Sequence, residues 1–471
     1  MPTRLRVMDM GFLAEETVYA PRQVATLAIL DPGPDGFDHD KLLTSINERL
    51  DFVPRYRQRV VAVPGNLGRA VWTDDEDFDL TYHVRRSALP RPGSSAQLRD
   101  LVSRLIARRL DRERPLWEAY LVEGLEHDRV ALLIKSHEAL VDGTQTVDLA
   151  QVLLEETDRF REVPGEVWQP RPAPGAAELL AGSVVDNLRR PTELVSQASS
   201  TMRSVLGRLP RVGRYPGDQS GPLTATLSQQ RRFVTVDTRL ADYRRVRDAH
   251  GGTVNDVILA TVAGGLRGWL LTRGDQLRST TRVRALVPMS VLDADAEPNS
   301  LGSQVVGYLV SLPVGESSPV MRLHQVSYAL KAHKETGRAV AASQLASLPG
   351  FAPTTFHALA VRVAESESPH SYELGITNVP GPQEALYIAG ARMVETYPAL
   401  PLSPGHAVAL GVTSYDGGVY FGLVADRDAV PDADVLGQCL REALEELVET
   451  TTDTWTTRAP RGRKRPSRPD Q

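Results

Sequence analysis

The sequence predicts an α/β protein with mixed sheets and two domains. Its 471 residues exceed the length that one hydrophobic core usually organises. Strand-like and helix-like segments follow one another irregularly along the chain, which favours mixed sheets over a barrel or a doubly wound sheet. A segment rich in Pro and Gly at residues 163–175 marks the boundary between the halves.

We expect an N-terminal domain at residues 1–162, a crossover linker at 163–231, a C-terminal domain at 232–455 and a disordered basic tail at 456–471. The linker contains a weakly amphipathic helical stretch whose arginines could meet anionic lipid, with a solvated helix face as the alternative. The tail has six basic residues and one acidic residue, so the rest of the chain carries a net charge of −10. That charge argues against a nucleic-acid-binding body.

In the first half, apolar patterns predict strands at 23–30, 117–122 and 130–135 and helices at 40–50 and 98–110. The segment 130–135 is apolar without alternation, as in a central strand that is covered on both faces. In the second half, a capping box at Thr253–Asp256 opens a helix that is apolar nearly all round and should be buried. The other elements expected there are strands at 232–236, 283–287, 305–312, 374–377, 386–397, 406–414 and 419–424, and helices at 319–333 and from about 431.

The cellular setting is predicted from two features. Cys439 is the single cysteine, which excludes an intrachain disulfide and suits a reducing cytoplasm. The N-terminus is charged and lacks the apolar core of a signal peptide. We therefore expect a cytoplasmic protein.

The chemistry-bearing candidate is the run His137, Glu138, Asp142 and Gly143, which follows the predicted strand 130–135 and precedes a helix. Polar residues at a strand exit are well placed to face a cleft. A hydrogen-bonded loop histidine with Asp142 as a helix cap is the alternative on spacing alone. A metal site is not expected, because no H-E-x-x-H helix is present. A serine hydrolase is poorly supported, because no G-x-S-x-G elbow occurs.

The chain resembles the bacterial wax ester synthase/diacylglycerol acyltransferase family, within the CoA-dependent acyltransferase superfamily. The resemblance covers about residues 5–450 and rests on several motifs in order. These are HExxxDG itself, Met8 to Leu13 (MDMGFL), residues 54–59 (PRYRQR), the PLW motif at Pro115, Leu116 and Trp117, the ND motif at Asn255 and Asp256, Val287 to Ser290, Leu301 and Gly302, and the run from Thr377 and Asn378 to Pro382.

The resemblance implies two similar domains with a tunnel between them, through which acyl-CoA and an alcohol reach the motif from opposite faces. It also implies direct acyl transfer without an acyl-enzyme and without a cofactor, acyl-CoA being a substrate. The family's motif is HHxxxDG, and its second histidine is the general base. Glu138 stands in that place here. An exposed glutamate, with a pKa of about 4.3, is a weaker base than histidine, whereas a partly buried one becomes more effective.

The resemblance assigns supporting roles to the remaining motif residues. Asp142 and Gly143 would be architectural, with Asp142 pairing with an arginine of the second domain, either Arg284 or, as runner-up, Arg282. The PLW residues would pack beneath the site. Asn255 and Asp256 would serve a helix cap and the domain interface, and Asn378 would line the tunnel.

The predicted function is transfer of a long-chain acyl group from acyl-CoA to diacylglycerol, giving triacylglycerol, with long-chain alcohols as further acceptors. Peripheral contact with a membrane or a lipid droplet is expected. One alternative is a catalytically silent paralogue that binds acyl-CoA or lipid, which the Glu138 substitution motivates. Another is an acyltransferase for a specialised lipid or polyketide.

Overall fold

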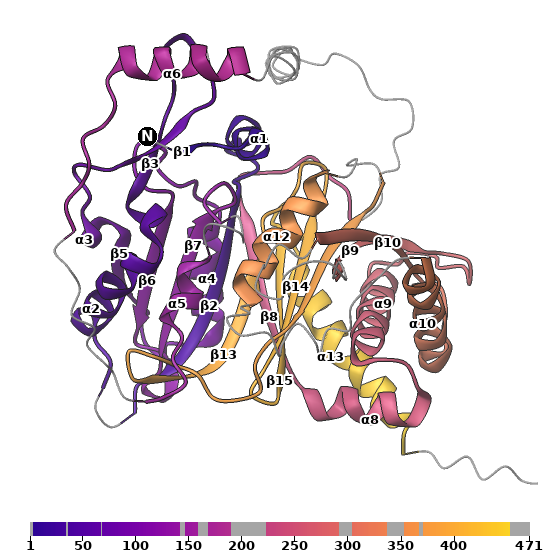
Figure 1. Ribbon diagram of the computed structural model, residues 1–471. Helices are drawn as coiled ribbons and strands as arrows, with labels where there is room; N and C mark the ends of the chain where they lie inside the picture. The colour runs from indigo at the N-terminus through magenta and orange to yellow at the C-terminus, as the bar shows by residue number, and fades with distance from the viewer. Residues whose placement is uncertain are drawn as a thin grey trace, which may run out of the picture.

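The computed structural model describes residues 3–33, 36–66, 68–141, 147–158, 168–189, 223–291, 304–336, 353–366 and 371–452. Within them the chain forms two six-stranded mixed sheets and one three-stranded sheet (Figure 1). The predicted α/β class with mixed sheets is therefore confirmed.

The first large sheet has the strand order β12-β13-β2-β7-β6-β5. Its strands are β2 (Gln23–Asp31), β5 (Val84–Ala88), β6 (Trp117–Glu123), β7 (Val130–His137), β12 (Tyr387–Ile388) and β13 (Ala391–Ala399). β7 is central and buried along its whole length, as its unbroken apolar run predicts. The helices of this half are α1 (Val7–Glu15), α2 (His39–Arg49), α3 (Leu80–His83), α4 (Ser95–Ile106) and α5 (Leu149–Leu153). A capping box between Ser94 and Gln97 opens α4.

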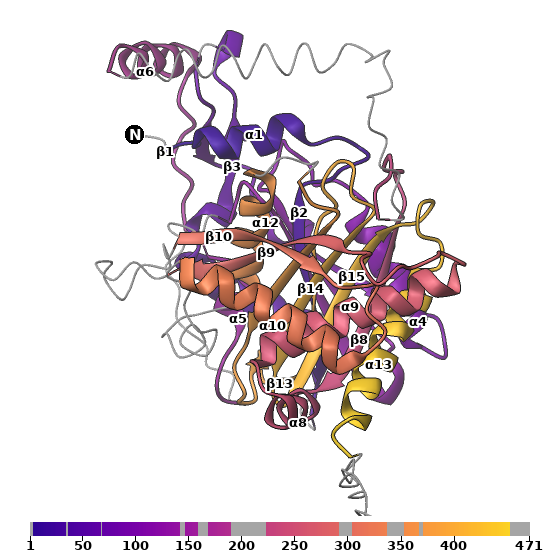
Figure 2. The same ribbon diagram turned by 90° about the vertical axis from the view of Figure 1, so that its right-hand side faces the viewer.

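A small sheet orders β1 (Thr3–Arg4), β4 (Val71–Asp74) and β3 (Gln58–Val61) at one end of the molecule. Beside it lies α6 (Ala176–Arg189), the helix of the predicted linker, at the top of Figures 1 and 2. Leu179 of α6 packs against Val63 and Val71. Short 3-10 helices cover Leu50–Phe52, Pro54–Arg57, Pro64–Asn66 and Glu126–Asp128.

The second large sheet has the order β10-β9-β11-β14-β15-β8. Its strands are β8 (Arg231–Arg239), β9 (Val283–Val291), β10 (Gln304–Leu312), β11 (Leu374–Pro380), β14 (Val408–Tyr415) and β15 (Gly418–Asp426). One face is covered by α8 (Leu240–His250), α9 (Val254–Thr272), α10 (Pro319–Thr336) and α13 (Ala433–Glu449). On the other side, α12 (Pro353–Ser366) contacts β9, β10 and β11 and also reaches β2 and α5 of the first half.

One long strand from the second half of the chain joins the sheet of the first half. β13 pairs in antiparallel register with β2, with Tyr397 opposite Leu27, although it lies within the second half of the sequence. A division of the chain at residue 232 therefore does not separate the two sheets. The strand expected at 386–397 is interrupted at Ala389 and Gly390, both with positive φ, and becomes β12 and β13.

The predicted core helix is α9. Thr253 and Asp256 form the expected capping box, and Trp269 is fully buried. Gly265 lets α13 approach closely, because a Cβ there would lie 2.6 Å from a methyl carbon of Leu440. Among the described helices α9 meets the length and composition of a membrane span, yet 72% of the relevant window is buried inside the protein. Cys439 is a buried free thiol, as expected.

Candidate active site

His137 ends the central strand β7, where it lies opposite Gln23 in the ladder. Its main-chain N–H donates to the Leu116 carbonyl at 3.0 Å, and its Nδ1 accepts from the Ala139 N–H at 3.0 Å. Because Nδ1 is an acceptor, the neutral ring carries its proton on Nε2, which lies 4.0 Å from Glu16 Oε1. Desolvation, with the charge of Arg112 as the next cause, lowers the pKa of His137 to about 3. His137 is thus a neutral, oriented ring without a free basic nitrogen.

Glu138 directly follows the strand and is fully buried. Its N–H donates to the Arg22 carbonyl at 3.1 Å. Neither carboxylate oxygen has a hydrogen-bond partner among the described residues. Desolvation raises the pKa of this carboxyl group, while the charges of Arg22 and Arg362 oppose the rise. A buried carboxylate without a hydrogen bond is costly, and such a group in a native fold commonly has a functional cause.

The arginine that reaches the motif from the second half is Arg362 on α12, a residue that the motif analysis did not identify. Its Nη1 donates to the main-chain carbonyls of Glu138 and Val141 at 2.7 and 3.3 Å, and its Nη2 pairs with Asp9 of α1. Asp9 is itself buried and belongs to the MDMGFL segment. Arg362 therefore fixes the turn after the strand from both halves of the molecule.

Arg284 does not approach the described part of the motif. It lies on β9 with an exposed side chain, and Glu373 is its neighbour, at 4.0 Å from Nε. Because Asp142 is not among the described residues, its pairing with Arg284 stays a prediction. Arg282, the runner-up, is also exposed and donates to Gln325 at 3.1 Å. Asp142 and Gly143 lie outside the described residues.

The chain re-enters the described region at residue 147, where three contacts hold it. Asp148 caps α5 by accepting from the Ala150 N–H at 2.9 Å, and its own N–H donates to Thr355 Oγ1 at 3.0 Å. The Leu149 N–H donates to the Tyr56 hydroxyl at 2.9 Å, and this hydroxyl also contacts Ser136 at 3.1 Å. Tyr56 thus ties the strand before the motif to the helix after it. Burial raises the pKa of Tyr56, with the charge of Asp148 as the next cause.

The PLW residues lie beneath the strand end. Leu116 and Trp117 are fully buried and Pro115 is buried. Trp117 donates from Nε1 to the Tyr56 carbonyl at 2.7 Å and stacks on His83 with ring centres 4.7 Å apart. Their contacts are those of packing.

The ND residues lie in the second half. Asp256 caps α9 and accepts from the Ser327 hydroxyl at 2.7 Å. Asn255 accepts from Asn378 Nδ2 at 2.7 Å, which joins α9 to β11. Both contacts are internal to the second half.

Charged neighbours of the motif form a group that the motif analysis missed. Glu16 follows α1 and accepts from Arg112 Nη2 at 2.6 Å and, through Oε1, from the Arg22 N–H at 3.3 Å. Arg22 in turn pairs with Glu15 at 3.1 Å. The available signal was the acidic pair Glu15 and Glu16 after MDMGFL, of which Glu16 is buried and therefore needs a cation.

An apolar cavity of about 40 Å³ lies between the two large sheets. It is lined by Thr26 and Ile134 from the first sheet and by Thr413 and Tyr415 from the second. Neither His137 nor Glu138 lines it, so a continuous interdomain tunnel stays a prediction. No group of His, Cys, Asp and Glu within the described ranges has the arrangement of a metal site.

Comparison with known proteins fits this geometry. Residues 5–258 match the family model of the wax ester synthase/diacylglycerol acyltransferase catalytic domain, and residues 301–448 match the WS/DGAT C-terminal domain. The chain belongs to the wax ester synthase/diacylglycerol acyltransferase family.

Two relatives come from Mycobacterium tuberculosis. The probable diacylglycerol O-acyltransferase tgs1 is 32% identical over 453 residues, covering 94% of this chain and 95% of the relative. The probable diacylglycerol O-acyltransferase tgs3 is 43% identical over 260 residues, covering 52% of this chain and 96% of the relative.

Among solved structures, the wax ester synthase/diacylglycerol acyltransferase from Marinobacter aquaeolei VT8 is 26% identical with a TM-score of 0.66, covering 95% of this chain and 100% of that one. The first condensation domain of the calcium-dependent antibiotic synthetase is 15% identical with a TM-score of 0.56, covering 96% and 97%. The second likeness shows the fold alone.

Proposed function

We propose that this protein is an acyl-CoA-dependent O-acyltransferase that transfers a long-chain acyl group to diacylglycerol, giving triacylglycerol, with long-chain alcohols as further acceptors. Family membership and the printed names of the relatives support the reaction class. The observation that carries the proposal is the fully buried carboxylate of Glu138, which has no hydrogen-bond partner among the described residues.

The chemistry follows from that carboxylate. Glu138 takes the proton of the acceptor hydroxyl as its oxygen attacks the thioester carbonyl carbon. The tetrahedral intermediate then expels CoA as the thiolate, and Glu138 returns the proton to the sulfur, so no atom of the enzyme is consumed. An acceptor hydroxyl would supply the hydrogen-bond donor that the carboxylate lacks. Desolvation makes the carboxylate a stronger base than an exposed glutamate.

The neighbours of Glu138 have supporting roles in this scheme. His137 cannot substitute as the base, because Nδ1 is engaged and Nε2 carries a proton. Arg362 fixes the main chain on either side of the Glu138–Val141 turn. The positive charges of Arg22 and Arg362 favour the ionised form of this carboxylate.

The test is CoA release by purified protein with long-chain acyl-CoA and a panel of acceptors. Glu138→Gln keeps the shape of the side chain and removes the base, so the rate should fall by about 10²–10⁴. Glu126→Gln is the matched control, because Glu126 is exposed at the opposite end of β7. Unchanged turnover in Glu138→Gln, with an unchanged control, would remove Glu138 from the mechanism.

Glu138→His separates two views of the site. If the pocket favours a carboxylate, the histidine variant stays below the native rate. If the native glutamate is a lost catalytic histidine, the histidine variant exceeds it.

The second candidate function is a silent paralogue that binds acyl-CoA or lipid. It is favoured by the position of Glu138, which is fully buried and lies outside the cavity between the sheets. Calorimetry decides between the two functions: acyl-CoA binding without CoA release from diacylglycerol, fatty alcohols or specialised hydroxyl acceptors supports the silent protein. Release with a specialised acceptor alone supports a narrower acyltransferase.

We also propose a cytoplasmic location with peripheral contact to a lipid surface and no cofactor beyond the acyl-CoA substrate. The support is the lipid character of the proposed acceptors together with three exposed apolar side chains, Met8 on α1 and Val18 and Tyr19 shortly after it. Co-sedimentation with diacylglycerol-containing vesicles tests the contact. Its absence at low salt would contradict it.

A further inference from the structure

A groove of about 440 Å³ lies between α4 and the start of β8. We call it the arginine groove, because its charged lining is dominated by Arg99, Arg104, Arg231, Arg232 and Arg427. Two aspartates, Asp100 and Asp434, are the acidic residues of the lining. The excess of positive charge contrasts with the net charge of −5 of the whole chain. Its volume falls in the range of about 300–1,000 Å³ that is typical of small-molecule sites.

The arginines of the groove are incompletely neutralised. Arg232 Nη1 pairs with Asp434 at 3.0 Å, but its Nε is buried without a hydrogen-bond partner in the described parts of the chain. Within those same parts, Arg99, Arg104 and Arg427 form no ion pair. Arg104 and Arg427 are exposed and Arg99 is half-buried, so their guanidinium groups remain available to a ligand.

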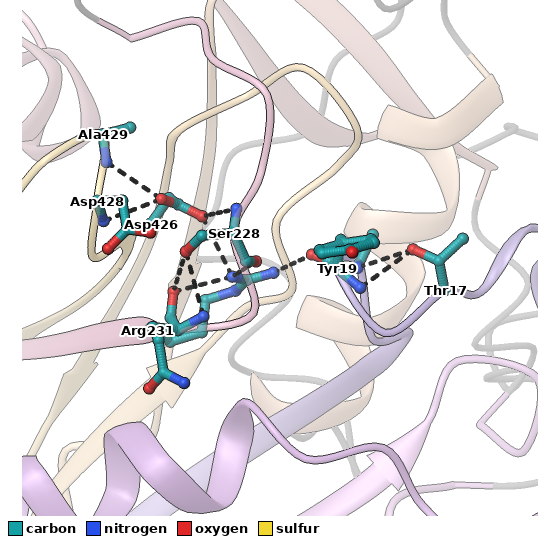
Figure 3. A network of polar contacts seen from close by, with 9 residues as sticks. Thr17, Tyr19, Ser228, Arg231, Asp426, Asp428 and Ala429 are labelled. Carbon is teal, nitrogen blue, oxygen red and sulfur yellow. Dashed lines mark hydrogen bonds and ion pairs between the residues drawn. The ribbon is translucent and has the colours of Figure 1, made fainter. Parts of the chain in front are cut away.

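Arg231 is a buried arginine of the groove. Figure 3 shows its guanidinium group between Asp426, at 3.3 Å, and the main-chain carbonyl of Tyr19. It also donates to the Ser228 carbonyl at 2.7 Å. Asp426 is held in turn by the Ser228, Asp428 and Ala429 N–H groups. These contacts hold the Arg231 side chain in place, so the neighbouring arginines are the ones left to contact a ligand.

Two chains of contacts link the lining of the groove to the candidate active site. The Phe233 N–H donates to Ser103 Oγ at 2.8 Å, which joins β8 to α4. At the end of α4, the Ile106 carbonyl accepts from Gln23, the ladder partner of His137, at 2.8 Å. Ser103 and Ile106 are one helical turn apart, about 4.5 Å along the axis. The second path runs from Arg231 to Tyr19, three residues after Glu16, which faces His137.

We infer that the arginine groove binds the phosphate groups of the 3′-phosphoadenosine diphosphate end of acyl-CoA, while the thioester end extends toward Glu138. The inference rests on the proposed function, which makes acyl-CoA the donor. Guanidinium groups bind phosphate oxygens through paired, charge-assisted hydrogen bonds, and several of them suit a ligand with three phosphates. The groove is polar and charged, so it does not suit the acyl chain.

Binding measured without turnover is the direct test. Titration calorimetry compares native protein with the double variant Arg99→Ala/Arg427→Ala, using CoA as the probe. The matched control is Arg244→Ala/Arg245→Ala, which removes the same charge from exposed positions on α8. We expect roughly tenfold or greater weakening of CoA binding in the groove variant and less than twofold in the control. Equal affinities in the two variants overturn the inference.

Truncated probes identify the phosphates. Dephospho-CoA lacks the 3′-phosphate and S-acyl-pantetheine lacks the whole nucleotide. Relative to native protein, the groove variant should lose less affinity for dephospho-CoA than for CoA, and its affinity for S-acyl-pantetheine should be unchanged. Increased salt should narrow the difference between native and variant CoA binding, since exposed charge pairs are screened. A variant that weakens all three probes alike has damaged the fold or the thioester site, and the inference fails.

Kinetics separate the groove from the proposed function. The groove variant should raise KM for acyl-CoA at unchanged kcat and unchanged KM for the acceptor. Turnover with an unaltered KM refutes the groove and leaves the acyltransferase standing. Weakened CoA binding without any turnover in native protein refutes the acyltransferase and leaves the groove standing. Phosphatidic acid vesicles supply the other phosphate source: loss of vesicle binding with intact CoA binding would assign the groove to lipid headgroups and overturn the inference.

Discussion

Asp148 offers a measurement of how firmly the end of the motif loop is buried. It caps α5 with its side chain, and its main chain is tied to Thr355 of the second half. Desolvation, opposed by the hydrogen bond from the Ala150 N–H, raises the pKa of Asp148 from 3.8 to about 6. Asp148→Asn keeps the capping oxygen and removes the charge, because asparagine caps helices about as well as aspartate.

The pKa shift sets the size of the effect. A rise from 3.8 to about 6 means that the ionised carboxylate destabilises the folded state by about 3 kcal/mol above pH 7. Because the folded pKa lies above the unfolded one, this cost is absent below pH 3.8 and grows as pH rises through about 6. At pH 4.5 it is about 1 kcal/mol. Asp148→Asn should therefore gain about 2 kcal/mol relative to native protein between pH 4.5 and 7.5.

Denaturant unfolding of both proteins at pH 4.5 and 7.5 measures this difference, and groups that titrate alike in both cancel. Any pH-independent cost of the new amide cancels as well. Asp148→Ala serves as the control for the cap and should lose about 0.5–2 kcal/mol relative to Asp148→Asn at both pH values. If the difference between Asp148→Asn and native protein is the same at pH 4.5 and 7.5, Asp148 is not desolvated and this account of the loop is wrong.

Two further predictions concern the strand end itself. Arg362→Met should lower the free energy of unfolding by about 3–5 kcal/mol, because it leaves the buried Asp9 carboxylate without its main partner. Denaturant unfolding of Arg362→Met, Asp9→Asn and the double variant measures the coupling. The double variant should lose less stability than the sum of the two single losses, and an additive loss would mean that the pair is not coupled. His137, with a pKa lowered to about 3, should show no imidazole titration by NMR between pH 5 and 8. Because the folded pKa lies below the unfolded one, the contribution of His137 to stability is present above pH 6.5 and is lost as pH falls toward 3. An NMR titration midpoint of His137 near neutral pH would mean that the ring is in solvent.

Local sequence patterns predicted most of the strands and the long helices, since apolar periodicity is a property of each segment alone. The apolar run of β7 and the capping box of α9 are examples. Arg362 could not be found that way. An arginine on a helix is normally exposed, and this one is buried only because Asp9, 353 positions away in the sequence, and two main-chain carbonyls meet it. The MDMGFL motif contains Asp9 but does not indicate that its partner is Arg362.

The surroundings of Arg284 could not be predicted from the sequence for a related reason. Its strand was correctly predicted, but the order of strands in a sheet depends on contacts between distant segments. β9 lies between β10 and β11, and Arg284 faces Glu373 beside β11. The crossing of β13 into the first sheet was equally invisible, because its sequence shows only that it is a strand. The motif drew attention to the residues at the strand end, and tertiary contacts determined what surrounds them.

The surroundings of Glu138 also bear on how a carboxylate could serve as the proposed general base. Burial disfavours the charged form of either residue, so it raises the pKa of a glutamate and lowers that of a histidine. The fall of the pKa of His137 to about 3 shows what this strand end does to an imidazole. At position 138 desolvation raises the pKa of the carboxyl group, while the charges of Arg22 and Arg362 oppose the rise. Burial and the charges of the same two cations would both lower the pKa of an imidazole at this position. Burial thus strengthens a glutamate and weakens a histidine as a base at this position, which is the physical reason for proposing Glu138 as the general base.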